Sequence, residues 1–147
     1  MSDLLFRVVG IPKGQPRTRA FSRNGRAGVY DPGTADEWKF LIRTEALRQF
    51  SAQKLRTFEN PTFADFVFFF ARPKSHFRSN GELKPTAPKW MTSKPDRDNL
   101  DKAVLDALVN AGILLDDKIV VAGSIEKRYV AQDQPPGMSA VLRKVEP

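Results

Sequence analysis

The sequence contains no cysteine and a single histidine, His76. Without cysteine there are no disulfides, thiolate metal sites or thiol nucleophiles, which suits a reducing compartment. One histidine has no second imidazole with which to build a metal or catalytic group, so we expect His76 to be an ordinary loop residue. No apolar run reaches membrane-spanning length, and residues 1–10 lack the features of a signal peptide. We therefore expect a cytoplasmic protein without a membrane partner.

Positive charge is what the chain has in excess. It carries 24 Lys and Arg against 17 Asp and Glu, a formal net charge of +7 over 147 residues. Such a balance favours polyanionic partners, because each neutralised phosphate releases counterions. The cations are concentrated in two stretches. One holds Lys13, Arg17, Arg19, Arg23 and Arg26 with no acid between them, and the other holds Arg72, Lys74, Arg78, Lys84, Lys89, Lys94 and Arg97 against Glu82 and Asp96.

Each basic stretch has two interpretations. Runs of like charge are commonly solvated loops. Alternatively, forked guanidinium groups grip phosphates, and the residues then expected to bind DNA are Lys13, Arg17, Arg19, Arg23, Arg26, Arg72, Lys74 and Lys94. The second stretch also carries Phe77, Trp90 and Met91, and exposed rings among cations suit stacking on unpaired bases. The alternative is that Trp90 folds back onto the domain, and the sequence leaves both interpretations open.

The first half of the chain predicts a strand, a loop, a helix and a strand. Apolar alternation predicts a strand over 4–11, and the Gly- and Arg-rich segment 13–32 predicts a loop or a loose hairpin. Thr34 and Glu37 have the spacing of a capping box. They would begin a helix over about 35–54, whose apolar face carries Trp38, Leu41, Ile42, Ala46 and Phe50. The aromatic run within 61–71 predicts a central strand covered on both sides.

The second half predicts a helix and two strands. Apolar residues at helical spacing predict a helix over 99–110, with Asp98 as its N-cap and Gly112 as its stop. Alternation predicts one strand over 118–130, with Ile119, Val121, Ile125 and Tyr129 inward, and a last strand over 139–145 that pairs with it as a hairpin. We therefore predict one α+β domain over 1–147, a small mixed β-sheet packed with two main helices.

Acidic residues flank the second predicted helix. Asp96 and Asp98 precede it, and the pair Asp116 and Asp117 follows it. A helix over 99–110 is about 18 Å long, and the next seven residues span up to about 23 Å when extended. The chain can therefore return along the helix and bring Asp117 to the first two acids. Completion of the site by a partner subunit is the alternative.

Converging carboxylates without histidine or cysteine form an all-oxygen site, which suits Mg²⁺ or Mn²⁺. Beside a phosphodiester, such a site generates hydroxide and neutralises charge on the leaving oxygen. Lys102, one turn into the helix, would stabilise the transition state. The structural alternatives are that Asp98 only caps the helix, that Lys102 only pairs with Asp98 or Asp106, and that Asp116 and Asp117 only form a turn.

This region also resembles a known signature, that of the RusA-type Holliday junction resolvases, which are small metal-dependent endonucleases of bacteria and their prophages. The residues that carry the resemblance are Pro95-Asp96-x-Asp98-Asn99-Leu100-x-Lys102-Ala103, then Leu105-Asp106-Ala107-Leu108, then Gly112 and Asp116-Asp117. The family usually has Gln two places after the acidic pair, where this chain has Ile119. Every acid of the signature is present.

The resemblance implies a structure-selective, Mg²⁺-dependent endodeoxyribonuclease that resolves four-way DNA junctions in recombination and repair. It implies a homodimer, because resolution needs paired nicks. On this basis Asp96, Asp98 and Asp117 are the expected metal ligands and Lys102 a further catalytic residue. Asp116 would face away if its segment is extended, and it would support the site together with Asn99. The alternatives are a catalytically inactive DNA-binding protein, such as a prophage remnant, and a metal nuclease that prefers flaps or forks.

Overall fold

A mixed β-sheet of five strands is the frame of the fold in the computed structural model, which describes residues 3–30 and 32–146. The strands are β1 (Leu4–Val9), β4 (Thr62–Phe70), β5 (Val120–Ala122), β6 (Ile125–Tyr129) and β7 (Gly137–Lys144). β7 lies between β1 and β4 and is antiparallel to both. β5 and β6 share the other edge of β4 and run parallel to it.

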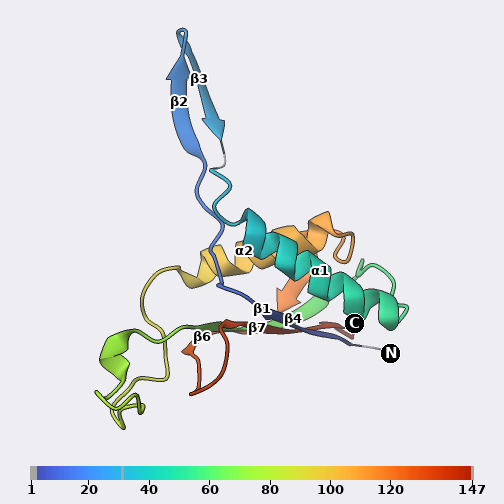
Figure 1. Ribbon diagram of the computed structural model, residues 1–147. Coiled ribbons are helices and arrows are strands. Elements are labelled where there is room, and N and C mark those ends of the chain that lie inside the picture. Colours follow the sequence, from blue (N-terminus) through green and yellow to red (C-terminus); the bar gives the residue numbers. More distant parts are fainter. Residues whose placement is uncertain (1–2, 31, 147) are drawn as a thin grey trace.

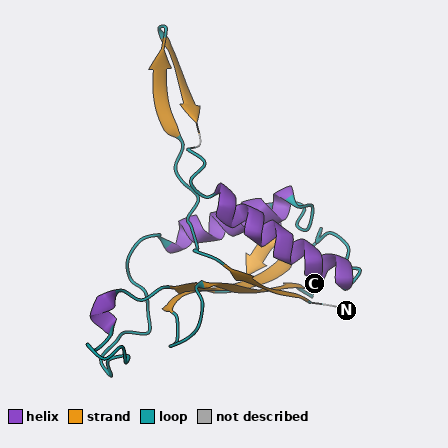
Figure 2. Cartoon of the chain, viewed as in Figure 1, coloured by secondary structure: helices purple, strands orange, loops and turns teal. Residues whose placement is uncertain are grey.

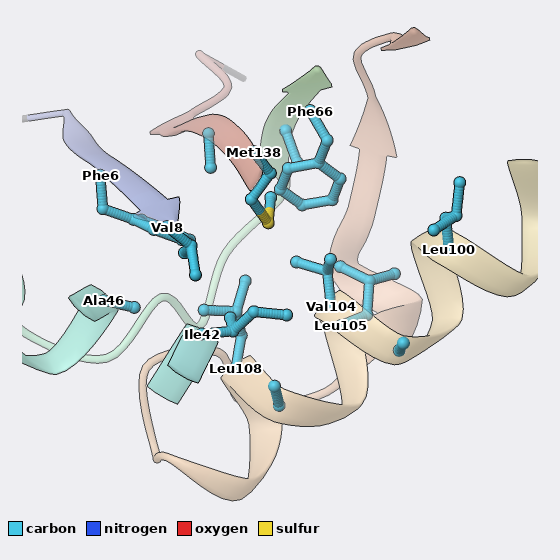
Figure 3. Packing of buried hydrophobic residues seen from close by; sticks show 14 of the residues in the cluster. Phe6, Val8, Ile42, Ala46, Phe66, Leu100, Val104, Leu105, Leu108 and Met138 are labelled. Carbon is cyan, nitrogen blue, oxygen red and sulfur yellow. The ribbon is translucent and has the colours of Figure 1, made fainter. Parts of the chain in front are cut away.

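Two helices, α1 (Asp36–Ala52) and α2 (Arg97–Asn110), pack against each other on one face of this sheet (Figure 1). That face is apolar because alternate strand residues point the same way. The helices bury their predicted apolar stripes against it (Figure 3), and the largest fully buried side chains are Trp38, Phe66, Phe68, Leu4, Ile42, Leu100, Leu108, Ile113, Leu114, Met138, Leu142 and Val104. The predicted α+β fold with two main helices is confirmed, and Trp38 is a core residue.

The opposite face of the sheet carries no helix or second sheet in the described part of the chain, which corrects one prediction. β4 is central, as expected, because both of its edges are paired. It is not covered on both sides, however, since Val67 and Phe69 remain partly exposed. On the same face, Leu5 is 53% and Val9 is 67% exposed. The aromatic sequence of β4 correctly predicts a buried strand. It does not reveal whether a second layer of helices or strands covers the other face of the sheet.

The predicted strand over 118–130 is in fact broken. A 3₁₀ turn, η2 (Asp117–Ile119), precedes β5, and Gly123 separates β5 from β6. Gly123 has φ 131°, and a Cβ there would collide with the backbone carbonyl of Ala64. This close approach interrupts the alternation, so that Val121, expected to point inward, is 59% exposed.

The expected hairpin of the last two strands is wrong. β6 pairs in parallel with β4, whereas β7 is inserted between β4 and β1. Both edges of β4 are thus occupied by the C-terminal part of the chain. Closeness in sequence favours a hairpin of the last two strands. Instead, the backbone N–H and C=O groups on the two edges of β4 pair with β6 on one side and β7 on the other.

Both helices begin differently from the sequence prediction. Thr34 and Glu37 form no capping box, because Ala35 is the residue before α1 and no side chain caps the helix. Asp98 is not the N-cap of α2, since Arg97 is already helical and Asp96 occupies that position. The stop of α2 is confirmed: the helix ends at Asn110, and Gly112 has φ 75°.

A second, two-stranded sheet is formed by β2 (Arg19–Arg23) and β3 (Arg26–Tyr30). It projects from the body of the domain as a hairpin (Figures 1 and 2). The loose hairpin expected within 13–32 is therefore confirmed. Among the described residues, no helix has both the length and the apolarity that a membrane crossing requires.

Candidate active site

The N-terminus of α2 presents two carboxylates that the helix does not use. Asp96 is the N-cap residue and Asp98 lies in the first turn, yet no side chain caps the helix. Only the backbone carbonyl of Asp96 takes part, accepting from the N–H of Leu100 at 3.1 Å. Both aspartates are exposed. The positive end of the helix dipole stabilises their negative charge. Both carboxylates can therefore stay ionised while they face solvent or a bound cation.

The chain after α2 turns back against the last turns of the helix. Ile113 and Leu114 are buried, and both of their N–H groups donate to the carbonyl of Leu108. The returning segment is also held by Phe58, whose N–H donates to Ile113 at 2.8 Å and whose carbonyl accepts from Leu115 at 3.0 Å. These bonds fix the position at which the Asp116–Asp117 pair leaves the core.

Asp117 reaches α2 beside an acid that the sequence analysis missed. Asp101 is half-buried, one turn after Asp98, and its pKa is raised above the ordinary value. Burial is the main cause; the positive charge of Arg97 opposes it, and the negative charge of Asp117 adds to it. Asp117 is therefore close enough to the first two turns of α2 to act on Asp101 electrostatically. The i, i+3 spacing from Asp98 was the signal that could have singled out Asp101.

Asp116 has a structural task in this turn. Its backbone is extended, with φ −161° and ψ 149°, and its carboxylate accepts from the N–H of Lys118 at 3.1 Å. That bond is the first cause of its lowered pKa, and a side-chain hydrogen bond with Asp117 is the second. The segment is not extended beyond Asp116, because Asp117 starts η2. The expectation that the two carboxylates face opposite ways rested on an extended segment and is corrected here.

Lys102 and Asp106 are not paired with each other. The Nζ of Lys39, on α1, lies 3.9 Å from Asp106 Oδ2. Lys102 is exposed, and it takes part in no ion pair within the part of the chain that the structure describes. Its charge is thus available at the surface of α2.

Within residues 3–30 and 32–146, no three Asp, Glu or His side chains lie close enough together to hold a metal ion. The structure therefore does not gather Asp96, Asp98 and Asp117 into a closed cage: Asp96 borders the N-terminal loop, whereas Asp117 lines a separate hollow with Asp106 and Asn110. The donor set is nevertheless the right one for Mg²⁺, which is typically held by one or two carboxylates together with water and substrate phosphates. The residues fit such an ion chemically.

A groove of about 800 Å³ opens beside Asp96. Its cationic side chains are Lys13, Arg17 and Lys94, and Asn99 also contributes to the wall. The remaining wall residues are Ile11, Pro12, Gly14, Gln15, Pro16, Phe70 and Pro95. Three residues predicted to bind DNA are thus gathered next to a predicted ligand, although they come from segments about eighty residues apart in the chain.

The base of the N-terminal loop is fixed directly to α2. The N–H of Gln15 donates to the carbonyl of Asn99 at 2.8 Å. A Cβ at Gly14 would come within 2.9 Å of Asn99 Cβ and 3.1 Å of Pro95 Cβ, so glycine permits this close contact. The backbone of Asn99 thus anchors the base of this loop, and its expected supporting role at the metal site stays a prediction.

Arg72 holds the second basic loop together. Its guanidinium donates to the carbonyls of Val130 at 2.7 Å and Pro88 at 2.6 Å, and it lies 5.4 Å from the Tyr129 ring centroid. Arg72 is therefore a structural residue of the loop, and the DNA contact expected from its charge stays a prediction. His76 pairs with the same guanidinium and packs edge-on against Tyr129, consistent with an ordinary loop role.

Elsewhere in this loop, the aromatic residues divide between the core and the surface. Met91 is buried in the core. The backbone of Trp90 does fold back onto the sheet, where it forms an isolated antiparallel bridge with Arg128 of β6. Its side chain nevertheless remains 50% exposed, with Lys89 Nζ 4.7 Å and Arg128 Cζ 5.4 Å from the ring centroid. Lys74, in the short turn η1 (Lys74–His76), is exposed.

Exposed carboxylates at a helix N-terminus beside a cationic groove are the arrangement expected of a protein that acts on a polyanion. Comparison with known proteins makes this specific. The family model described as Endodeoxyribonuclease RusA matches residues 10–137, most of the chain. The chain is also 32% identical over 148 residues to the uncharacterized protein YqaN of Bacillus subtilis (strain 168), covering 99% of each sequence. The chain belongs to the RusA endodeoxyribonuclease family.

Proposed function

We propose that this protein is a structure-selective endodeoxyribonuclease that resolves four-way DNA junctions by paired nicks, with Mg²⁺ or Mn²⁺ as its cofactor. The observation that carries the proposal is the pair Asp96 and Asp98. In a chain of the RusA family, neither carboxylate caps the helix that they begin, and Asp96 lines a groove that also carries cations. Recombination and repair are the processes in which such junctions arise.

In this proposal Asp96, Asp98 and Asp117 hold the divalent ion. Once bound, the ion would supply an activated water and neutralise charge on the leaving oxygen. The aspartates provide the oxygen donors, while Asp116 holds the turn that positions Asp117. Lys102 keeps an unpaired positive charge on the same helix, where it stabilises the charge that builds up on the phosphate during attack. Its exposure leaves room for a DNA strand.

The groove supplies the substrate contacts. Lys13, Arg17 and Lys94 line it beside Asp96, and cations in this position hold the phosphates on either side of the bond to be cut. Lys94 lies two residues before Asp96, so a strand that contacts both is fixed in register with the acids. Positioning of this kind contributes much of the rate enhancement in phosphoryl transfer.

The uncovered face of the sheet is a candidate interface for the proposed homodimer. Leu5 and Val9 are exposed there, and Val67, Phe69 and Val141 beside them are partly exposed. Apolar residues gathered on a flat face typically mark a protein interface. A two-fold axis through this face would direct both active helices outward, one toward each of two related strands, which is what paired cleavage requires.

The test is a cleavage assay that offers a four-way junction, a fork, a flap and plain duplex, each with and without Mg²⁺. Our proposal predicts metal-dependent paired nicks in the junction and little cutting of duplex. Preferential cutting of the fork or flap would replace it with a different branched substrate. Binding to all four substrates without cutting would identify an inactive DNA-binding protein.

A further inference from the structure

The β2–β3 hairpin buries almost nothing against the rest of the protein. The described side chains of residues 19–29 are exposed, with Gly28 alone of intermediate exposure. The hairpin stands clear of both helices and the main sheet (Figure 2). A two-stranded ribbon without a packing partner is only marginally stable in water, so its sequence is not explained by the core of this domain. The register of its strands offers an explanation.

The register separates the hairpin into two different faces. Directly opposed residues of an antiparallel pair point to the same side. One face carries the pairs Phe21 with Gly28 and Arg23 with Arg26, and Arg19 continues it two residues before Phe21. The other face carries Ala20, Val29, Ser22 and Ala27. One side is thus cationic and aromatic, and the other is small and uncharged.

Two details show that the cationic face is held in one register. The two turn residues, Asn24 and Gly25, have φ 54° and 75°, the positive values that a tight type I′ turn requires. The Phe21 ring lies against Gly28, where a Cβ would come within 2.6 Å of the ring. Glycine at this position therefore provides the seat of the ring, while 45% of Phe21 remains exposed.

The hairpin begins close to the candidate active site along the chain. Its first strand begins four residues after Gln15, whose N–H is bonded to Asn99 of α2. Five residues per strand give a ribbon about 16 Å long. A thin ribbon with one small face can enter a groove of DNA, because a two-stranded ribbon fits the major groove.

We propose that the Arg19–Phe21–Arg23–Arg26 face of this hairpin inserts at the branch point of the DNA, with Phe21 stacking on a base that the branch leaves unpaired. This rests on the proposed function and adds to it a residue that selects branched over continuous DNA. The arginines, with no acid between them, contact phosphates of either kind of DNA. Phe21 contributes only where a base face is free, because paired and stacked bases offer none.

The experiment uses a four-way junction with the fluorescent base 2-aminopurine at the branch point, and a duplex of the same sequence, without divalent metal so that nothing is cut. The variants are Phe21→Ala, Phe21→Trp and Gly28→Ala. Val29→Ala is the matched control, since Val29 is 68% exposed on the opposite face of the same ribbon. Thermal unfolding of each variant verifies that the body of the domain is unchanged.

We expect Phe21→Ala to weaken junction binding by roughly tenfold, within the range measured for loss of one base–aromatic stack. Duplex binding should not change, and the 2-aminopurine signal induced by wild-type protein should disappear. Gly28→Ala should resemble Phe21→Ala because it displaces the ring, whereas Phe21→Trp should retain both binding and signal. Equal junction affinity and equal signal for Phe21→Ala and Val29→Ala would overturn the inference.

The outcomes also separate this inference from the proposed function. Normal junction cleavage with Phe21 irrelevant to binding overturns the stacking role and leaves the nuclease proposal standing. Phe21-dependent binding and signal without cleavage of any substrate supports the stacking role and overturns the nuclease proposal. Absence of junction binding by the wild-type protein overturns both.

Discussion

Asp96 and Asp98 differ from the acids of an ordinary helix start because the helix uses neither side chain as a cap. An aspartate that caps a helix satisfies backbone N–H groups and stabilises by about 1 kcal/mol. Here that contribution is absent, so removing either charge should cost little in folding. Loss of activity without loss of stability is the signature of a functional carboxylate, and it can be measured residue by residue.

We expect Asp96→Asn, Asp98→Asn and Asp117→Asn each to lower junction cleavage at least about a hundredfold, because a ligand charge worth several kcal/mol is removed. Junction binding should persist or tighten, since each change removes repulsion from phosphate. Cleavage and binding are measured in parallel at saturating Mg²⁺.

Asp116→Asn is the comparison variant, as Asp116 holds the turn through the N–H of Lys118. It should retain more activity than Asp117→Asn. An inactive Asp116 variant beside an active Asp117 variant would refute the assignment of the ligands.

Lys102 allows a second distinction at this scale. We expect Lys102→Ala to lose cleavage while still binding the junction, because the lysine is assigned to charge in the transition state. Replacing Mg²⁺ with Mn²⁺ should not restore activity, since the metal ligands are intact. If Mn²⁺ restored cleavage, the role assigned to Lys102 would change from stabilising the transition state to positioning the metal.

At the scale of elements, the break between β5 and β6 depends on one residue. Gly123 has φ 131°, and its Cα faces the carbonyl of Ala64 on β4. Gly123→Ala should therefore lower the free energy of unfolding by about 3 kcal/mol or more, from strain and from displaced backbone.

Gly112→Ala is the matched control for this substitution. Gly112 has φ 75°, but nothing lies within 4 Å of a Cβ built there. Only the left-handed conformation is penalised, at about 1 kcal/mol. Urea unfolding of both variants measures the difference. An equal loss of unfolding free energy in the two variants would show that the backbone around Gly123 moves away from β4 without an energetic cost.

The N-terminal loop and hairpin form an element whose charge should govern binding in general. Replacing Arg17, Arg19 and Arg23 with Ala should weaken binding to all junction sequences. It should also reduce the slope of log K against log salt by about 2 to 3, since each lost phosphate contact removes about 0.9.

A control with the same loss of charge is Arg48, Arg56 and Lys144 changed to Ala. All three residues are exposed. Arg48 lies in the C-terminal part of α1, and Arg56 and Lys144 line one hollow, whereas the hairpin lies beyond the N-terminal end of α1 (Figure 1). Electrophoretic binding assays at several salt concentrations compare the two triple variants. Equal slopes would mean that only net charge matters and that the N-terminal cations make no specific contact.

At the scale of the whole molecule, the uncovered sheet face should be the surface through which two copies associate. Leu5→Asp and Val9→Asp introduce charge on that face and should convert a dimer into a monomer, as measured by sedimentation. Phe40→Asp is the control, because Phe40 is 51% exposed on α1, on the helical side of the domain. A wild-type monomer that still makes paired nicks would refute the dimer. A dimer that is sensitive only to Phe40→Asp would place the interface elsewhere.

The sequence by itself determined the parts of this protein that depend on local pattern. Apolar spacing of 3.6 predicted both helices and their buried faces, and the aromatic run predicted the central strand β4. Gly112 predicted the stop of α2 because few other residues adopt positive φ. The spacing of the acids before and after α2, together with Lys102 within it, was sufficient to indicate the family.

Only the tertiary structure decided how these parts meet. Alternation could not reveal that Gly123 breaks a strand, because the cause is the Ala64 carbonyl, nearly sixty residues away in the chain. It could not place β7 between β1 and β4, because a strand carries no local record of its partner. Asp101 was missed for the same reason: its burial and its exposure to the charge of Asp117 exist only once the chain has folded back on α2. Contacts between distant segments are made by packing, and packing is a property of the whole chain.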